Sequence, residues 1–394
     1  QTDQGVMRTY EVGALGVLAS RGDLDLDATS LTLAVQGSGA TARTGRILAA
    51  LASSRADTDT AKGTVRVTQS LDNKGLIFSA NDLEVQAPSI TVGCTSALSA
   101  LPDLSVSATD GELDLSLAGP AAGAGNIAVQ DQGLLYAGRN LGARANGKLS
   151  IRGQVLAGNS IDLLANTVEN NAEINSDNDI RIVAATLLNQ PQGGDTRVFS
   201  STEGSAGSVK EGGEYDDNGD GGNLNIAQNW RKTFTETLGF APGATPTDKP
   251  QITGGRNVQL VFHTAKNLGG LIYGGASVDL VGFSFNGAVT DLQAMKDWNV
   301  VDGKHGYSQG GATFTNDSLA TRTWTKTIRW TQHREEAGWA GGVENFDWRL
   351  CSRAGSWDDV CDYDGYQPAV TDKLESAEVM TAGVYTRTLP GNGI

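Results

Sequence analysis

A short glycine-containing phrase recurs along the 394-residue chain at nearly constant spacing. It begins with Gly, runs through apolar or small residues to a Gly or Ala beside Asn, Asp or Ser, and ends on an aliphatic residue. Copies lie at 75–83, 133–141, 153–161 and 270–278, and the second and third copies are offset by 20 residues. A fixed period near 20 residues, made of strand and turn residue types, is typical of a stacked repeat protein rather than of a globular pocket enzyme.

Aliphatic anchor residues set the length of one repeat. Leu141, Ile161 and Ile180 step by 20 and 19 residues, and apolar and polar residues alternate around each anchor with the period of a β-strand. At about 3.3 Å per residue, one coil of this length holds about three short strands with their turns. The sequence therefore predicts an all-β chain folded as a right-handed parallel β-helix, in which each strand pairs with its counterpart in the next coil.

The repeat pattern divides the chain into four regions. Residues 1–198 carry β-helix repeats, residues 199–250 form an acidic, Gly-rich excursion, and residues 251–282 resume the repeat. Residues 283–394 do not repeat, and they contain six of the seven Trp residues. The most regular strand pattern of the chain lies in this last region, at 321–331, so an irregular, β-rich C-terminal module is expected there.

Charge and hydropathy argue against several classes of partner. The formal net charge is −15 and no run of Lys and Arg occurs, which disfavours binding to nucleic acid. No stretch approaches 18 consecutive apolar residues, so no transmembrane segment is predicted. The repeat is already present near Gly16 and no signal peptide precedes it, so we expect a monomeric, internal fragment of a longer protein.

Residues that could support catalysis or bind a metal ion are sparse. The three His residues have no metal-ligand spacing, and no P-loop or dinucleotide-binding motif is present. Asp216, Asn218 and Asp220 copy the first half of a calcium loop, but Ala227 occupies the position of the bidentate Glu. This segment is a weak calcium candidate, and the alternative is a solvated acidic loop. The sequence thus predicts no catalytic residues, no cofactor and no established metal site.

Aromatic and Arg residues of the C-terminal module form the candidate recognition site. Cys351 and Cys361 lie ten residues apart, and a disulfide between them would pre-organise a binding loop and suit an oxidising, cell-surface setting. Trp, Tyr and Arg dominate binding hot spots, although the same aromatics could instead form the core of a small capping domain. The candidate residues are Trp324, Trp330, Trp339, Trp348, Arg349, Arg353, Trp357, Tyr363 and Tyr366.

The repeats resemble the filamentous haemagglutinin repeats of large two-partner-secreted exoproteins. Within that group the chain is most similar to CdiA-type effectors of contact-dependent growth inhibition, over residues 10–190 and 251–282. The resemblance implies a secreted protein on the surface of a Gram-negative bacterium, with a β-helical stalk and a receptor-binding region. That region would recognise an outer-membrane protein or lipopolysaccharide on a neighbouring bacterium for toxin delivery. The family supplies no residue motif for the receptor contacts.

Two other functions stay open at this point. A β-helical enzyme that degrades polysaccharide would need carboxylates or Arg clustered at one register on successive coils, and the sequence shows isolated ones. A passive rod segment of a host-directed adhesin would differ from a receptor-binding effector only in its partner.

Overall fold

The computed structural model describes residues 9–37, 42–51, 61–93, 95–109, 125–217, 224–283, 293–294, 299–300, 306–309, 312–336, 348–351 and 379–380. Every regular element in these residues is a β-strand, so the expected all-β class is confirmed. The chain divides into two units, which are described one at a time. Unit 1 comprises Gln1–Asp195, Pro246–Leu319 and Val384–Ile394, and unit 2 comprises Thr196–Thr245 and Ala320–Gly383.

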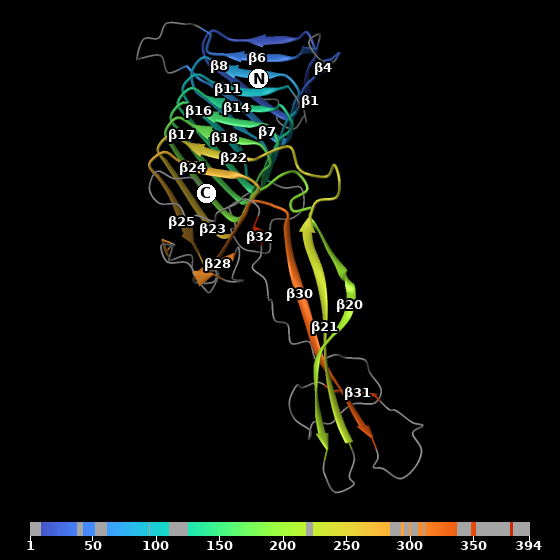
Figure 1. Ribbon diagram of the computed structural model, residues 1–394. Coiled ribbons are helices and arrows are strands. Elements are labelled where there is room, and N and C mark those ends of the chain that lie inside the picture. Colours follow the sequence, from blue (N-terminus) through green and yellow to red (C-terminus); the bar gives the residue numbers. More distant parts are fainter. Residues whose placement is uncertain are drawn as a thin grey trace. The chain divides into compact units, whose positions relative to one another are not determined.

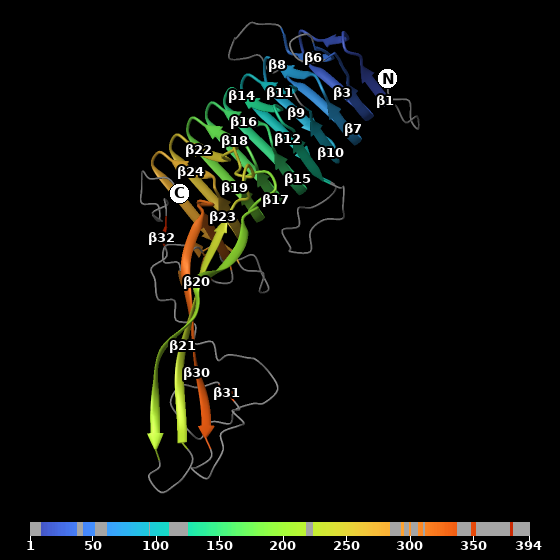
Figure 2. The same cartoon turned by 45° about the vertical axis from the view of Figure 1, so that its right-hand side comes forward.

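Unit 1 is built from three columns of parallel strands, and one passage of the chain through the three columns forms a coil (Figures 1 and 2). Column 1 is a nine-stranded sheet in which every neighbouring pair is parallel. Its strands are β2 (Val17–Ala19), β6 (Arg46–Ala49), β8 (Leu76–Ser79), β11 (Ala97–Ala100), β14 (Leu134–Ala137), β16 (Gln154–Ala157), β18 (Glu173–Ser176), β22 (Gln251–Gly254) and β24 (Leu271–Gly274).

Columns 2 and 3 belong to one sixteen-stranded sheet, because its long strands continue around the corner between the two columns. The long strands are β3 (Leu24–Leu33), β7 (Gly63–Asn73), β15 (Asn140–Ile151), β17 (Ser160–Asn170), β19 (Asp179–Asn189) and β23 (Asn257–Leu268). Column 2 also contains the short strands β9 (Leu83–Gln86), β12 (Leu104–Ala108) and β25 (Ser277–Gly282). Column 3 also contains β1 (Thr9–Val12), β10 (Ser89–Val92), β13 (Asn126–Val129) and β29 (Ala312–Asp317).

Short antiparallel strands are added to these columns. β26 (Gln293–Ala294) pairs with β25, while β28 (Gly306–Gln309) joins β29 to β27 (Asn299–Val300). A separate two-stranded ladder is formed by β4 (Val35–Gln36) and β5 (Arg43–Thr44).

The pairing of columns 2 and 3 closes on itself at one place. Strands β7, β10, β13, β15, β12 and β9 form a ring of six strands in which every neighbouring pair is parallel. The ring arises because β7 and β15 run through the corner and so belong to both columns. The coils between them have separate strands in column 2 and column 3.

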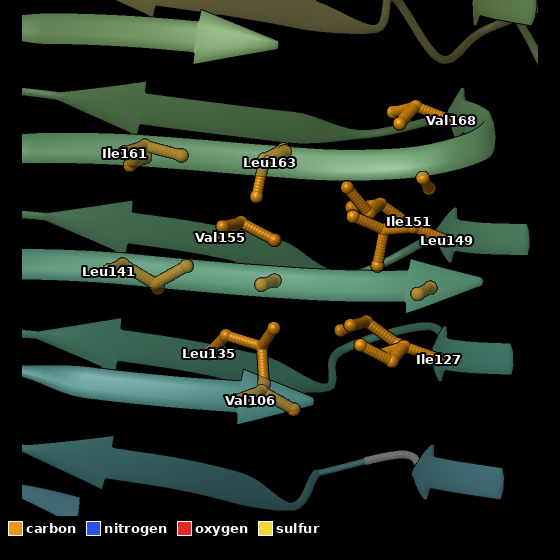
Figure 3. Close-up of a cluster of buried hydrophobic side chains, with 14 of the residues drawn as sticks. Val106, Ile127, Leu135, Leu141, Leu149, Ile151, Val155, Ile161, Leu163 and Val168 are labelled. Carbon is orange, nitrogen blue, oxygen red and sulfur yellow. The ribbon is translucent and has the colours of Figure 1, made fainter. Parts of the chain in front are cut away.

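Aliphatic residues of successive coils are direct partners in these columns. Leu141 is paired with Ile161, and Ile161 with Ile180, as the repeat spacing predicts. In column 1, Leu135 is paired with Val155 in the same way. All five side chains are buried, and Figure 3 shows side chains from the three columns meeting in one interior cluster. Since removing apolar surface from water contributes about 25 cal/mol per Å², each coil gains most of its stability by covering its neighbours.

Glycines of the recurring phrase lie where the backbones of consecutive coils approach each other. A Cβ atom on Gly153 would lie 2.6 Å from the carbonyl oxygen of Gln130 and would overlap that of Gly133. A Cβ atom on Gly158 would overlap the carbonyl oxygen of Gly138. None of these glycines is among those with positive φ. Glycine is therefore needed at these positions because a side chain would not fit, and not because of an unusual backbone conformation.

A ladder of buried Asn amides follows the corner between columns 3 and 1. Asn170 Nδ2 donates to Asn189 Oδ1 (2.8 Å), and Asn189 Nδ2 donates to Asn267 Oδ1 (2.7 Å). The ladder ends where Asn267 Nδ2 donates to Asn316 Oδ1 (2.8 Å). Asn170 Nδ2 also donates to the carbonyl oxygen of Gln251 (3.0 Å). Because a buried polar group is costly unless it is hydrogen-bonded, the ladder allows a polar turn inside an otherwise apolar stack.

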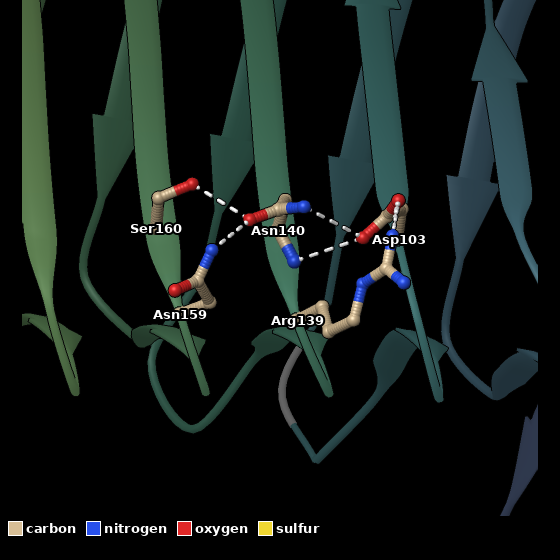
Figure 4. A network of polar contacts seen from close by, with 5 residues as sticks. All are labelled: Asp103, Arg139, Asn140, Asn159 and Ser160. Carbon is tan, nitrogen blue, oxygen red and sulfur yellow. Dashed lines mark hydrogen bonds and ion pairs between the residues drawn. The ribbon is translucent and has the colours of Figure 1, made fainter.

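A second polar ladder lies at the corner between columns 1 and 2 (Figure 4). Asp103 Oδ1 accepts hydrogen bonds from the backbone nitrogen (3.1 Å) and the side-chain Nδ2 (3.0 Å) of Asn140, and Arg139 donates to Oδ2 (2.9 Å). Asn140 Oδ1 accepts from Asn159 Nδ2 (2.6 Å) and Ser160 Oγ (2.8 Å). These bonds join successive coils, so this corner is structural.

Unit 2 is an antiparallel sheet with the strand order β20 (Val198–Asp217), β21 (Leu224–Gly239), β30 (Arg322–Glu336) and β31 (Trp348–Cys351), and β32 (Val379–Met380) also pairs with β30. The expected excursion at 199–250 thus supplies two long strands. The chain division differs from the boundary expected at residue 283, because β29 pairs with β23 inside unit 1 while β30 belongs to unit 2.

We expect Gly153→Ala to lower the urea midpoint of unit 1, because the added methyl group would push two coils apart. Overpacking of this kind costs about 1–3 kcal/mol. Gly142→Ala is the matched control in β15, since nothing lies within 4 Å of a Cβ atom built there. Far-UV circular dichroism in urea measures both midpoints, and equal midpoints for the two variants would contradict the packing explanation.

Candidate functional site

The four Trp positions of unit 2 that the structure describes lie on one face of its sheet. Trp230 of β21 is directly opposite Trp330 of β30. Trp324 precedes Trp330 by an even number of positions on the same strand, and Trp348 of β31 is opposite Arg334 of β30. Since directly opposite positions and alternate positions share a face, the four Trp positions lie on the same side. This side is named the aromatic face.

The other face of this sheet is rich in Thr. The positions of β30 that alternate with the aromatic face include Thr323, Thr325, Thr327 and Thr331. The hydroxyl groups of Thr237 and Thr323 lie 3.3 Å apart across β21 and β30. The two sides of the sheet therefore differ in chemistry, which makes the Thr side a built-in comparison for the aromatic face.

Charged side chains accompany the rings on the aromatic face. Lys232 Nζ forms an ion pair with Glu203 Oε2 (2.8 Å) and lies 5.5 Å from the ring centroid of Phe234. Phe199, in the edge strand β20, is 55% exposed. A partly exposed ion pair contributes less than about 1 kcal/mol to stability, but it orients the ammonium group over the ring. The described side chains of the aromatic face thus include one exposed ring and one ammonium group that lies over a second ring.

Several predicted recognition residues are placed only as strand positions. Trp324 and Trp330 lie in β30, and β31 carries Trp348, Arg349 and Cys351. The register puts Arg349 opposite His333 and Cys351 opposite Thr331, on the Thr side. The predicted residues that lie outside the described residues are Trp339, Arg353, Trp357, Cys361, Tyr363 and Tyr366, and the proposed disulfide of Cys361 with Cys351 therefore stays a prediction.

The weak calcium candidate is also placed only in part. Asp216 lies in β20 opposite Asn225, whereas Asn218 and Asp220 lie outside the described residues. Among the residues that the structure describes, no group of three or more His, Cys, Asp or Glu side chains could hold a metal ion.

Trp230 was not among the residues predicted from the sequence. It lies in the segment that was expected to be an acidic excursion, where the Gly-rich residues near 210–223 mask the strand pattern that follows. The signal that could have found it is the alternation over 224–238, which places Trp230, Lys232 and Phe234 on one side.

Unit 1 contains a polar cleft of about 900 Å³ beside the corner between columns 3 and 1. The cleft is formed where the chain leaves the stack after β19 and returns at β22. Gln192 from the departing segment and Asp248 from the returning segment line it together with turns of the preceding coils. Its charged lining residues are Asp131, Arg152, Glu173, Asp248 and Lys249, and its amide lining residues are Gln132, Gln154, Asn171, Gln192 and Gln251.

A hydrogen-bonded network supports one side of the cleft. Asn171 Nδ2 donates to the carbonyl oxygen of Gln190 (2.9 Å) and to Glu169 Oε1 (3.4 Å). Glu169 also forms an ion pair with Lys148 and accepts a hydrogen bond from Gln190 Nε2 (3.4 Å). Burial alone would raise the pKa of Glu169, but the Lys148 ammonium and the amide donors outweigh it and hold that pKa below its ordinary value.

Comparison of this chain with family models, with curated proteins and with solved structures gave no match. Within the part of the chain that the structure describes, no helix has the length and apolar character needed to cross a bilayer. Function therefore has to be inferred from the aromatic face and the polar cleft themselves.

We expect Lys148→Met to raise the pKa of Glu169, because the variant removes the positive charge that favours the carboxylate. With its pKa lowered in the folded state, Glu169 contributes stability above its unfolded pKa, and that contribution is lost as the pH falls below about 4.5. The Lys148 side chain is 47% exposed, so the loss in the variant at neutral pH is below about 1 kcal/mol. Carbon-detected NMR titration measures the pKa, and an unchanged value would refute the pairing.

Proposed function

We propose that the chain belongs to a secreted, cell-surface exoprotein of the filamentous haemagglutinin-repeat type. In this proposal unit 1 serves as a stalk, and unit 2 recognises a receptor on a neighbouring bacterium for contact-dependent toxin delivery. The receptor class is an outer-membrane protein or lipopolysaccharide. The likeness of the repeats to such exoproteins supports the setting, and the construction of unit 2 supports the recognition role.

The aromatic face is the single observation that carries the recognition role. β21 and β30 come from separate excursions of the chain and pair over their whole length, from Leu224 opposite Glu336 to Leu238 opposite Arg322. This pairing sets Trp230 directly beside Trp330. Positions that backbone pairing fixes on a long sheet need little ordering of the backbone on binding, which favours affinity.

The stalk role rests on interpreting unit 1 as a right-handed parallel β-helix with coils of about 20 residues. Three columns of in-register parallel pairs support this interpretation, and the hand follows from the right-handed twist of strands. A closed six-stranded parallel barrel, built from the ring of β7 to β15, is the alternative. The β-helix is preferred because it also accounts for column 1, whose nine strands stack with the same step but take no part in the ring.

A recognition role predicts that binding to target cells depends on the aromatic face. We expect the double variant Trp230→Ala, Trp330→Ala to weaken binding of the whole chain to Gram-negative cells by at least about tenfold, because hot-spot truncations cost about 2 kcal/mol or more. Thr325→Ala on the Thr side is the matched control and should bind like the wild-type chain. Flow cytometry with fluorescently labelled protein measures binding, and circular dichroism verifies the fold.

Two outcomes would overturn the recognition role. One is equal binding by the double variant and the wild-type chain, and the other is no binding of the wild-type chain to any strain in a Gram-negative panel. The second outcome would instead favour a passive rod segment.

A further inference from the structure

The polar cleft of unit 1 presents the same kinds of group on successive coils. Gln154, Glu173 and Gln251 are direct partners in β16, β18 and β22, and all three line the cleft. Neighbouring strands are about 4.8 Å apart, so polar groups recur along the stack at that interval. Arg152 and Asn171 follow the paired residues Ile151 and Asn170, and they add a guanidinium and an amide to the lining in the adjoining turns. A ligand that lies along the stack would therefore meet similar groups at each step, which suits a polymer of similar polar units.

These lining groups are oriented before any ligand arrives. Gln154 Nε2 donates to Glu173 Oε2 (2.7 Å), and Asn175 Nδ2 donates to Glu173 Oε1 at the long distance of 3.5 Å. An ionised carboxylate has about four acceptor sites, so Glu173 keeps acceptor capacity for a ligand. Asn171 is fixed by its bonds to Gln190 and Glu169. Groups that are already held in place bind at a lower entropic cost.

Charge and polarity of the lining narrow the class of ligand. Three carboxylates (Asp131, Glu173 and Asp248) and two cations (Arg152 and Lys249) line the cleft, within a chain whose net charge is −15. This balance disfavours phosphate-rich, sulfated or uronate ligands through repulsion. None of the described lining residues is a large apolar side chain, so a hydrophobic ligand or an apolar peptide anchor finds no pocket.

We propose that this cleft binds an uncharged oligosaccharide whose chain runs along the stack, across the strands of column 1. A sugar hydroxyl both donates and accepts hydrogen bonds, which matches a wall that mixes amide, carboxylate, guanidinium and ammonium groups. The cleft lies wholly within unit 1, so this binding is independent of the receptor recognition proposed for unit 2. No cleavage of the sugar is implied.

Isothermal titration of the whole chain tests the cleft with neutral hexasaccharides of glucose, mannose and N-acetylglucosamine. Hexagalacturonate and an uncharged Ser- and Gly-rich hexapeptide are the comparison probes. We expect at least one neutral hexasaccharide to bind, and Arg152→Ala and Gln154→Ala each to weaken that binding by at least about tenfold. Arg144→Ala is the matched control. Arg144 is an exposed Arg in the column 2 part of β15, the strand that immediately precedes Arg152, and it does not line the cleft.

The inference is overturned by failure of all three neutral sugars to bind, by stronger binding of the uronate or the peptide, or by equal losses in Arg152→Ala and Arg144→Ala. Circular dichroism midpoints of the variants separate loss of the site from loss of the fold. Because Trp230 and Trp330 lie in unit 2, the double Trp variant should bind the sugar like the wild-type chain. The two proposals can therefore fail separately.

Discussion

In-register hydrogen bonding between parallel strands of successive coils is the constraint on which unit 1 depends. Each inner residue is covered above and below by the residue at the same position of the neighbouring coils, as Leu141, Ile161 and Ile180 are. A position that works in one coil must therefore work in the next, and its chemistry is repeated along the stack. Aliphatic residues fill the interior, while the corners carry Gly where backbones touch and Asn where backbone groups need partners.

Departures from this regularity create the two candidate functional surfaces. After Asn189 the chain leaves the stack instead of making the turn of an ordinary coil. The departing segment with Gln192 and the returning segment with Asp248 lie beside the corner between columns 3 and 1, and the polar cleft forms there. The residues that leave in this excursion then pair with a second excursion that begins near residue 320, and together they make the sheet of unit 2. The aromatic face belongs to unit 2, whereas the polar cleft is lined in part by strand residues of the stack itself, such as Gln154 and Glu173.

Prediction from the sequence succeeded where the signal is local and periodic. The spacing of Gly153 and Ile161 from their counterparts predicted which residues of neighbouring coils would be partners, because every coil repeats the same short pattern. The alternation around Trp324 and Trp330 likewise predicted a long strand with two unlike sides. Prediction missed Trp230, because its strand follows a Gly-rich acidic segment and its partner lies far along the chain.

By itself, the sequence determined the all-β class, the step of about 20 residues and the residues that line the stacked interior. These follow from the two-residue alternation along each strand and from the repeat of one coil along the chain. Only the tertiary structure decided that β29 joins unit 1, that β30 joins β21, and that the cleft forms beside the interrupted coil. The physical reason is that pairing between distant strands is chosen by backbone hydrogen bonds and by side-chain fit across the pair. Neither factor produces a periodic pattern in the sequence of either strand, so the strand partners can be identified only from the folded structure.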